Sequence, residues 1–391
     1  MQSSSLNAPK SVPSEGSWAS VVAVSLGAFV LVSSECAPIG LLSQIANDLK
    51  ITEGEAGLLI TFPGVMAAIA APISISLFGK VNRRFILCGL LLALSLSNFV
   101  VAISTSIFPV LLARALLGVS LGGFWTIATS VGSRLRPSQQ TLRATSIIYS
   151  GISMGTVAGV PVSTLLGDWL GWRATFSLWG LFGFFALVGL VRTLPSLPPL
   201  PRLAVNGISS LIRLPKLRIG LVYIVLMLVA HFSAYTFVAP FLEESAAITG
   251  SLLSTFLLAY GIAGFAGNWL GGWYAGKNLT KAIAIAATGM TLSLASLMLS
   301  NSNGISLLGI VGWGMFFGTL PITTQLYVFN AAPNQKENIT AISVSIGQVS
   351  IAVGAFTGGL AVDYYDVTGA ILLGVALALA LAAMAVYIAI R

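Results

Sequence analysis

Three ionisable side chains lie inside long apolar runs of this 391-residue sequence: Glu35, Arg114 and His231. The stretch SLGAFVLVSSECAPIGLL surrounds Glu35 with residues that are otherwise apolar or small and neutral. An ionisable group in hydrocarbon is costly unless it is paired or lines a wet cavity, so each of the three is a functional candidate. A carboxylate or an imidazole can carry a proton, whereas an arginine stays charged at working pH.

Glu35 and Arg114 are expected to lie at similar depth. Glu35 comes about four residues before the end of its run and Arg114 about six after the start of another, which puts both roughly 6 to 9 Å below one boundary. Glu35 could be a proton carrier, a structural ion-pair partner of Arg114, or a residue of a water-filled outer vestibule. Arg114 could orient or discharge Glu35, or bind substrate directly.

His231 is the only histidine, and it is expected to lie deeper. It precedes Pro240 by nine residues, whereas Glu35 precedes Pro38 by three, so it should be about six residues or roughly 9 Å further in. This depth is near the membrane midplane. Three hypotheses remain for His231: contact with a substrate, proton transfer, or a neutral imidazole that is hydrogen-bonded between helices.

Aromatic and amide side chains occur at comparable depth and could complete a binding site. Rings stack on flat molecules and sugars, and amides bond to polar edges. Many intramembrane aromatic residues only pack or anchor, so this group is mixed. The first candidates for contact with a substrate are His231, Trp125, Tyr235, Gln325 and Gln348. Asn98 and Tyr149 are the next candidates. The remaining members are Tyr260, Asn268 and Trp313.

Several other kinds of chemistry are not indicated. Cys36 and Cys88 have no metal-ligand spacing and form no disulfide framework. The sequence carries no nucleophile elbow and no phosphate-binding loop, so we expect no enzyme activity, no cofactor and no metal, and transport energy from an ion gradient. The net charge of +8 is dispersed over short loops, which is atypical of nucleic-acid binding.

Twelve apolar segments must position these residues. Hydrophobic residues make up 56% of the chain and charged residues 8%, and the mean hydropathy is +0.95. Runs about 20 residues long cross a bilayer as helices, so we predict an all-α membrane protein with twelve transmembrane helices. The predicted spans are 18–39, 55–78, 85–104, 108–130, 144–166, 174–194, 219–241, 250–274, 282–300, 305–329, 339–362 and 368–390.

The loop charges predict the orientation. Sixteen of the 19 basic residues fall on the side that holds both termini, and eight of the 11 acidic residues fall on the other. Basic loops stay in the cytoplasm during insertion. Both termini are therefore expected to be cytoplasmic.

The chain also shows signs of an internal duplication. The proline-rich, basic segment 195–218 separates two predicted six-helix bundles, 17–194 and 219–391, and residues 1–16 form a cytoplasmic tail. Three anchors recur at offsets of 202, 197 and 199: Ala37-Pro38 with Ala239-Pro240, Gly79 with Gly276, and Gly155-x-x-x-Gly159 with Gly354-x-x-x-Gly358. Such repeats are typical of alternating-access transporters.

Glycines at helical spacing mark the fifth span, SGISMGTVAGVPVSTLLGDWLGWR. Gly151, Gly155 and Gly159 are four residues apart and Pro161 follows. Small residues at this spacing let two helix backbones approach closely, and the proline bends the helix. These positions resemble the antiporter motif of the twelve-span drug/proton antiporters in the major facilitator superfamily.

Two further segments carry the resemblance. RALLGVSLGGFW resembles the R-x-x-x-G motif through Arg114 and Gly118, and FGKVNRR resembles the loop signature of the superfamily through Gly79, Arg83 and Arg84. Asn82 stands in that loop where an acid is common. The resemblance implies that these residues, with Gly155, Gly159 and Pro161, serve the conformational cycle.

Other segments are similar to bacterial exporters of purine ribonucleosides (EGEAGLLITFPGVMAAIAAP) and of sugars such as arabinose (AHFSAYTFVAPF). The resemblance implies the major facilitator fold, a monomer in the bacterial inner membrane, and protons and a small molecule as partners. It predicts a proton-coupled antiporter that exports sugars, nucleosides or drugs. The alternative is an uncoupled facilitator, or a sensor that retains the fold.

Overall fold

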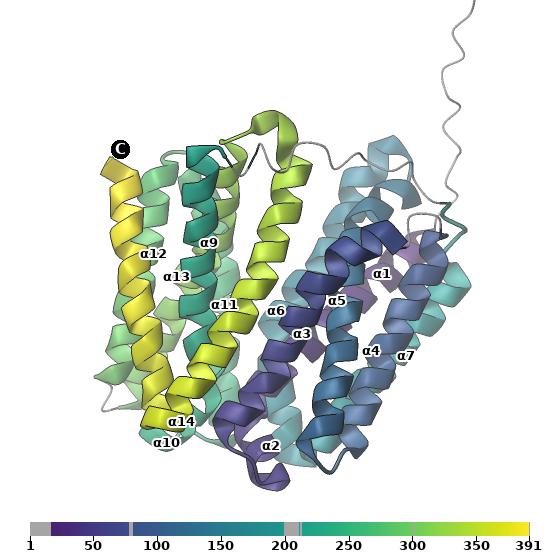
Figure 1. The fold of residues 1–391 in the computed structure, drawn as a ribbon. Coiled ribbons are helices and arrows are strands. Elements are labelled where there is room, and N and C mark those ends of the chain that lie inside the picture. The colour runs from purple at the N-terminus through teal and green to yellow at the C-terminus, as the bar shows by residue number, and fades with distance from the viewer. Residues whose placement is uncertain (1–16, 78–80, 199–210, 212, 300–301, 391) are drawn as a thin grey trace, which may run out of the picture.

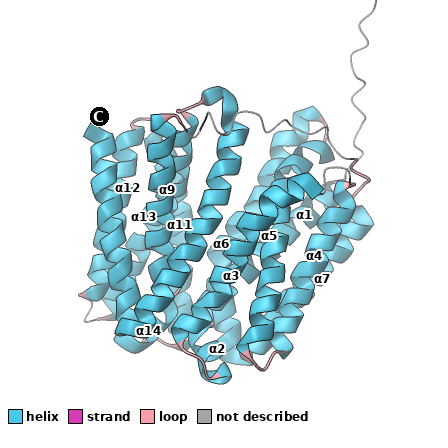
Figure 2. Cartoon of the chain, viewed as in Figure 1, coloured by secondary structure: helices cyan, strands magenta, loops and turns pink. Residues whose placement is uncertain are grey.

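The computed structural model describes residues 17–77, 81–198, 211, 213–299 and 302–390. The predicted tail 1–16, most of the predicted linker and Gly79 lie outside these residues. Within the described part the structure is helical, without strands, as Figure 2 shows. A segment that crosses hydrocarbon must satisfy its own backbone hydrogen bonds, and an α-helix does so within one segment.

The first half of the chain (the N-half) contains six long helices and one short helix that follows the first span. A 3-10 turn joins α1 to α2. The elements are α1 (Trp18–Cys36), η1 (Ala37–Gly40), α2 (Leu42–Leu49), α3 (Glu53–Leu77), α4 (Arg83–Ile103), α5 (Ile107–Leu135), η2 (Ser138–Gln140), α6 (Thr141–Leu170) and α7 (Trp172–Thr193).

The second half (the C-half) repeats this order, with a short helix again after its first span. The first of its helices begins at Pro215, four residues before the predicted boundary at 219. The elements are α9 (Pro215–Tyr235), α10 (Val238–Ala246), α11 (Gly250–Ala275), α12 (Leu279–Met298), α13 (Asn303–Phe329), η3 (Pro333–Gln335) and α14 (Lys336–Ile390).

Element α14 contains two membrane-crossing segments. Its 55 residues are too long for one crossing, and the backbone leaves the helical region at Tyr365 and Asp366, where φ is −138° and 60°. Figure 1 shows the chain reversing there, at the end of the molecule that also holds α2 and α10. Eleven helices of the described chain are long and apolar enough to span a membrane, and this reversal divides the last of them into the eleventh and twelfth predicted spans.

Glycine stripes hold equivalent helix pairs together in both halves. A Cβ added at Gly155 of α6 would lie 2.8 Å from the carbonyl oxygen of Phe29, and one at Gly354 of α14 would lie 2.9 Å from that of Val229. Four residues further on, Gly159 faces the backbone of Ser33 and Gly358 that of Ser233. Helix α6 therefore packs on α1 as α14 packs on α9.

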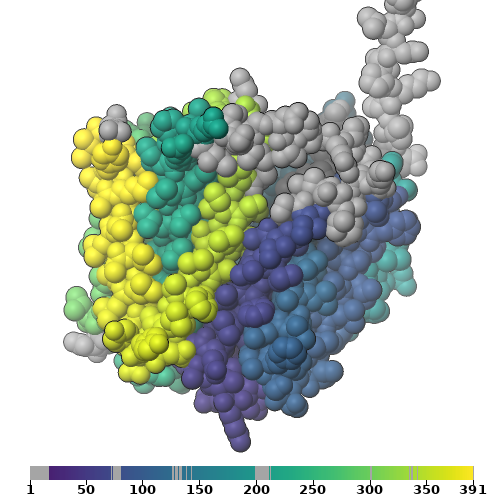
Figure 3. Space-filling model, in the orientation of Figure 1, coloured from purple at the N-terminus to yellow at the C-terminus, as the bar shows by residue number. Residues whose placement is uncertain are grey.

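The two halves meet along two helix pairs, α3 with α14 and α6 with α11, which we call the seam. Figure 3 shows the first pair side by side, α3 in purple-blue and α14 in yellow-green. Small residues form much of the seam. A Cβ at Gly359 would lie 2.9 Å from the carbonyl oxygen of Gly54, and one at Gly261 would lie 2.6 Å from that of Val157.

Polar contacts close the seam on the side of α2 and α10. The Ser43 hydroxyl donates to the Glu243 carboxylate across the halves at 2.7 Å, and the Ser254 hydroxyl donates to the Pro161 carbonyl at 2.7 Å. Burial raises the pKa of Glu243, so this carboxyl keeps its proton to a higher pH than a free glutamate does. The two halves are thus bonded to each other on this side.

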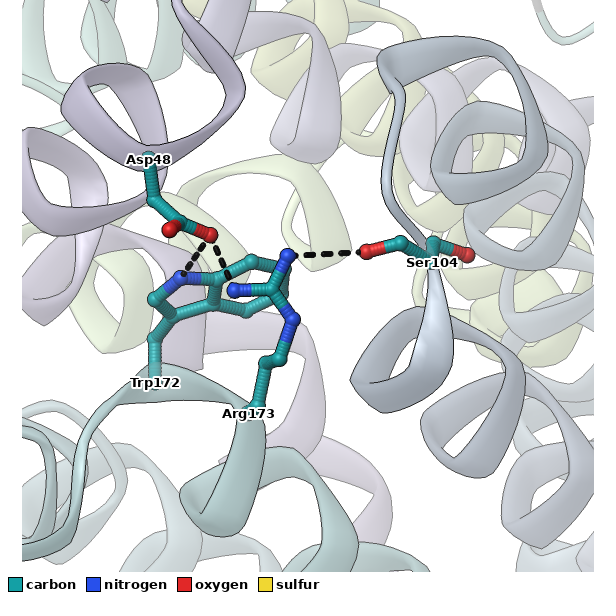
Figure 4. Close-up of polar contacts among 4 residues, drawn as sticks. All are labelled: Asp48, Ser104, Trp172 and Arg173. Carbon is teal, nitrogen blue, oxygen red and sulfur yellow. Dashed lines mark hydrogen bonds and ion pairs between the residues drawn. The ribbon is translucent and has the colours of Figure 1, made fainter.

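An exposed cluster fixes α2 to the rest of the N-half (Figure 4). Arg173 forms an ion pair with Asp48, and its other nitrogen donates to the Ser104 carbonyl at 3.1 Å. The Trp172 indole donates to the same Asp48 carboxylate at 3.2 Å. Hydrogen bonding to Arg173 lowers the pKa of Asp48. Because both charges are exposed, the ion pair contributes at most about 1 kcal/mol and mainly fixes position.

The glycine stripe on α6 gives a stability prediction. Gly155→Leu should lower the free energy of unfolding by about 1–3 kcal/mol, because a side chain there overlaps the backbone of α1. Gly89→Leu is the matched control, since a Cβ at this exposed helical glycine meets nothing within 4 Å. Melting temperatures in detergent measure both; equal temperatures for the two variants would contradict the close packing.

Candidate functional site

Arg114 on α5 is completely buried, with 0% of its surface exposed, and binds backbone oxygens of two other helices. Its Nε donates to the Leu59 carbonyl of α3 at 2.8 Å. Its Nη1 and Nη2 donate to the Ser34 and Glu35 carbonyls of α1 at 2.8 and 3.0 Å. One guanidinium therefore ties α5, α3 and α1 together.

Two of these carbonyls have no ordinary helical partner. In an α-helix the carbonyl of residue i accepts from the N–H of residue i+4, and proline has no N–H. Pro38 follows Ser34 by four residues, and Pro63 follows Leu59 by four. An unsatisfied backbone group in hydrocarbon costs several kcal/mol. Arg114 supplies the two donors that the prolines remove.

Gly118 and Gly122 on α5 allow this approach. A Cβ at Gly118 would contact the backbone of Pro63, and one at Gly122 would lie 2.5 Å from the Ala67 carbonyl oxygen. Because these two glycines have no side chains, α5 lies close to α3. Arg114 and Leu59 each lie one turn before the contact between Gly118 and Pro63, so the arginine can reach the Leu59 carbonyl. The R-x-x-x-G spacing thus puts the hydrogen-bond donor Arg114 one helical turn from Gly118, where the two helices approach closely.

Glu35 lies at the end of α1, half-buried beside this arrangement. Arg114 contacts its backbone oxygen, and the Glu35 carboxylate forms no ion pair with another described residue. The next residue, Cys36, packs against a buried cluster that combines most of the C-half core with N-half residues such as Ile39 and Ile60, so this turn of α1 lies where the halves meet. The Glu35 carboxylate is thus near a fixed positive charge without being paired to it.

His231 of α9 lies within a cluster of aromatic rings in the C-half. Its ring is nearly parallel to those of Phe317, Tyr235 and Tyr260, at interplanar angles of 7°, 23° and 20°. The Trp313 ring meets it edge-on, with centroids 5.4 Å apart. The Tyr260 hydroxyl is 3.5 Å from His231 Nε2, at the limit of a hydrogen bond. We call these five residues the aromatic cluster.

Several candidate residues keep a polar atom that is buried and has no hydrogen-bond partner in the described part of the chain. These are His231 Nδ1 and Trp313 Nε1 in the aromatic cluster, Trp125 Nε1 on α5, Gln348 Oε1 on α14 and Asn98 Oδ1 on α4. Buried polar groups are normally hydrogen-bonded, so unpaired ones need an explanation. These atoms come from both halves and include hydrogen-bond donors and acceptors. A polar ligand needs such partners.

The helix packing corrects the depth expected for His231. Ser33 and Ser233 occupy equivalent positions against Gly159 and Gly358, an offset of 200. The two Ala-Pro pairs differ by 202 residues, two more than the offset of 200 between structurally equivalent residues. They are therefore not at equivalent positions in the two halves. Tyr235 is the counterpart of Glu35, and His231 lies four residues deeper than that level instead of six.

The other predicted site residues differ in burial and partners. Asn98 is 1% exposed and donates to the Ser34 hydroxyl and the Leu94 carbonyl, at 3.1 and 3.0 Å, so it packs within the N-half. Tyr149 is 44% exposed on α6. Gln325 is half-buried on α13.

The loop before α4 is held by Asn82 in place of the common acid. Its Oδ1 accepts from the N–H groups of Arg84 and Leu197, each at 3.0 Å, and its Nδ2 donates to the Ser196 hydroxyl at 2.6 Å. Arg84 also donates to the Val191 carbonyl at 2.5 Å, and the Arg83 N–H bonds to the Leu197 carbonyl at 2.9 Å. Asn82 and the start of α4 are therefore tied to the last turn of α7 and to the chain that follows it.

Sequence reasoning does not single out Phe317, Leu59 or Pro63. A phenylalanine in an apolar span reads as packing, and a backbone carbonyl has no residue-type signal. One sequence feature could have indicated these contacts. Each of the two prolines lies four residues after a residue whose carbonyl then has no helical N–H partner and needs another donor.

The role of Arg114 can be tested by a double-mutant cycle. Arg114→Leu should destabilise the protein, because it leaves the Ser34 and Leu59 carbonyls unpaired. In a Pro38→Ala/Pro63→Ala background both helices regain their N–H donors, so the same substitution should cost about 1–3 kcal/mol less. Chemical unfolding in detergent measures each variant. An equal cost in both backgrounds would contradict the link between Arg114 and the prolines.

Residues 24–355 match the family described as the Major Facilitator Superfamily. The transcription regulatory protein OpdE of Pseudomonas aeruginosa is 31% identical over 89% of this chain and 88% of its own length. The purine ribonucleoside efflux pump NepI of Escherichia coli O6:K15:H31 is 29% identical over 91% of this chain and 90% of its own length.

Solved structures show the same fold. The crystal structure of a mutant of the nucleoside transporter NupG superposes with a TM-score of 0.79 at 13% identity, over 94% of this chain and 98% of that one. A D-xylose-proton symporter superposes with a TM-score of 0.74 at 16% identity, over 93% of this chain and 97% of that one. The sequence match, supported by this fold, shows that the chain is a multi-pass membrane transporter belonging to the major facilitator superfamily.

Proposed function

We propose that this protein is a proton-coupled antiporter that exports small polar or amphipathic molecules from a bacterial cell by alternating access. Purine nucleosides are the first candidates among nucleosides, sugars and drugs. The observation that carries the proposal is Glu35, a half-buried carboxylate where the halves meet, without an ion-pair partner among the described residues.

Glu35 is the residue proposed to carry the proton. Access to water favours the charged carboxylate, whereas enclosure between the halves favours the neutral acid, so its protonation can follow the position of the halves. Arg114 stays charged and is held by backbone oxygens, which makes it a positioning residue for the end of α1. One carboxylate at this position supports the exchange of one proton per cycle.

The aromatic cluster supports a flat, hydrogen-bonding substrate. The parallel rings of Tyr235, Tyr260 and Phe317 offer stacking surfaces, while Trp313 Nε1 and His231 Nδ1 offer unpaired polar atoms. A nucleobase combines a ring face with a polar edge, and a ribose adds hydroxyl groups. NepI, a similar protein, is a purine ribonucleoside efflux pump, which favours this class over sugars and drugs.

With both termini in the cytoplasm, the closed side of the seam is the outer one. We infer that this arrangement corresponds to an inward-facing state, in which a cytoplasmic substrate would enter between the halves. Outward opening would separate α3 from α14 and α6 from α11. The glycines of the antiporter motif would keep α6 and α1 together as one unit during this movement.

A sensor that retains the transporter fold is the second candidate. The similar protein OpdE carries the name of a transcription regulatory protein, at 31% identity. Uphill accumulation separates the candidates: only a coupled transporter concentrates a purine ribonucleoside inside proteoliposomes when a pH gradient is applied. Binding without accumulation would favour the sensor.

Glu35→Gln should abolish accumulation driven by a pH gradient and leave substrate exchange largely intact. The amide keeps the size and polarity of the side chain but carries no proton across. Uptake of a radiolabelled purine ribonucleoside with and without the gradient measures both activities. Glu55→Gln, at an exposed carboxylate on the first turn of α3, is the control and should behave like wild type. Wild-type uphill transport by Glu35→Gln would exclude Glu35 as the carrier.

His231→Ala should weaken nucleoside binding by about 1–2 kcal/mol, which is the loss of one buried hydrogen bond, and leave the pH dependence of transport in place. His231→Gln should recover part of that affinity, because an amide donates and accepts without titrating. Isothermal titration gives the affinities and vesicle uptake at several pH values gives the profile. If His231→Gln keeps full affinity but loses the pH dependence, the histidine is a proton relay.

A further inference from the structure

A cavity away from the aromatic cluster lies in the C-half, at the end of the molecule where the chain terminates. Its volume is about 310 Å³, at the lower end of the range for small-ligand sites. Four helix ends meet there, and Figure 1 shows that α9, α12 and α14 each have an end on this side. The lining residues are Lys216, Ile219, Thr280, Tyr327, Tyr387 and Ile388.

The cavity carries a positive charge that no carboxylate neutralises within the described chain. Lys216 has no ion-pair partner among these residues, and its Nζ lies 5.6 Å from the centre of the Tyr327 ring. It follows Pro215 in the first turn of α9, a helix start without a side-chain cap. The backbone N–H groups of such a turn also favour an anion.

Tyr327 provides a second, independent sign of a ligand. The residue is only 9% exposed and lines the cavity, and its hydroxyl has no hydrogen-bond partner in the described part of the chain. The Thr280 hydroxyl donates to Asn278 at 3.2 Å and can still accept a bond. A phenol hydroxyl that opens into the cavity beside a lysine is suited to donate to an oxyanion.

The remaining lining residues indicate an amphipathic molecule. Ile219 and Ile388 add apolar surface beside the charged end. The cavity lies at the ends of membrane-crossing helices, which is the level of lipid headgroups, and basic pockets between helices there bind anionic headgroups. We propose that this cavity binds a phosphate group, presented by an anionic phospholipid or by a free phosphate.

Binding is tested with purified full-length protein by following its melting temperature. The probes are short-chain phosphatidylglycerol, phosphatidylcholine and inorganic phosphate, each titrated separately, because a ligand of the folded state raises this temperature. Phosphatidylglycerol should raise it more than phosphatidylcholine if the lipid is the source. A rise with inorganic phosphate alone assigns the site to a free anion.

Two conservative variants connect the response to the cavity. Lys216→Gln should weaken the effective probe about tenfold, and Tyr327→Phe, which removes only the hydroxyl, about threefold. Lys277→Gln is the matched control: Lys277 stacks on Trp273 at 3.5 Å outside the cavity, and its loss should leave the response unchanged. Wild-type responses in both cavity variants, or equal responses of the wild type to both lipids without a phosphate effect, would overturn the proposal.

Discussion

Pro38 in η1 and Pro63 in α3 provide no N–H donor for the Ser34 and Leu59 carbonyls, and the single guanidinium of Arg114 supplies the donors instead. The bent end of α1 is stable in hydrocarbon only because a charged side chain from a third helix reaches it. The position of Glu35 depends on the same contact, since its own carbonyl is the third oxygen bound. A structural requirement therefore puts a permanent positive charge beside the carboxylate that is proposed to exchange protons.

The two halves share one packing plan and differ in chemistry. Gly118 and Gly122 face Pro63 and Ala67, just as Gly314 and Gly318 face Tyr260 and Gly264. Where the N-half has Glu35 at the end of α1, the C-half has Tyr235, and the deep residue next to it is His231. The duplication thus preserves how the helices pack, while the N-half carries the carboxylate and the guanidinium and the C-half carries the imidazole within the aromatic cluster.

The fold was largely predictable because each span is a long apolar run, and hydropathy reports such runs directly. The glycine spacing also predicted a close-packing face on α6, but not that its partner is α1. The contact partners of individual residues were harder to predict from the sequence. The contact of Arg114 with carbonyl oxygens, instead of with the Glu35 carboxylate, depends on backbone geometry, and so does the burial of Asn98 within the N-half. The two-residue shift at the Ala-Pro anchors arose because prolines need not occupy equivalent positions in a repeat.

At two points of the seam a glycine meets a neighbouring backbone directly, Gly359 that of Gly54 and Gly261 that of Val157. Surfaces of this kind do not interdigitate, so few side chains must leave their rotamers when the halves part, and little apolar area changes its surroundings at these points. Two such arrangements of one chain can differ by only a few kcal/mol. The binding energy of one small molecule, or of one proton, is then enough to change which arrangement is populated.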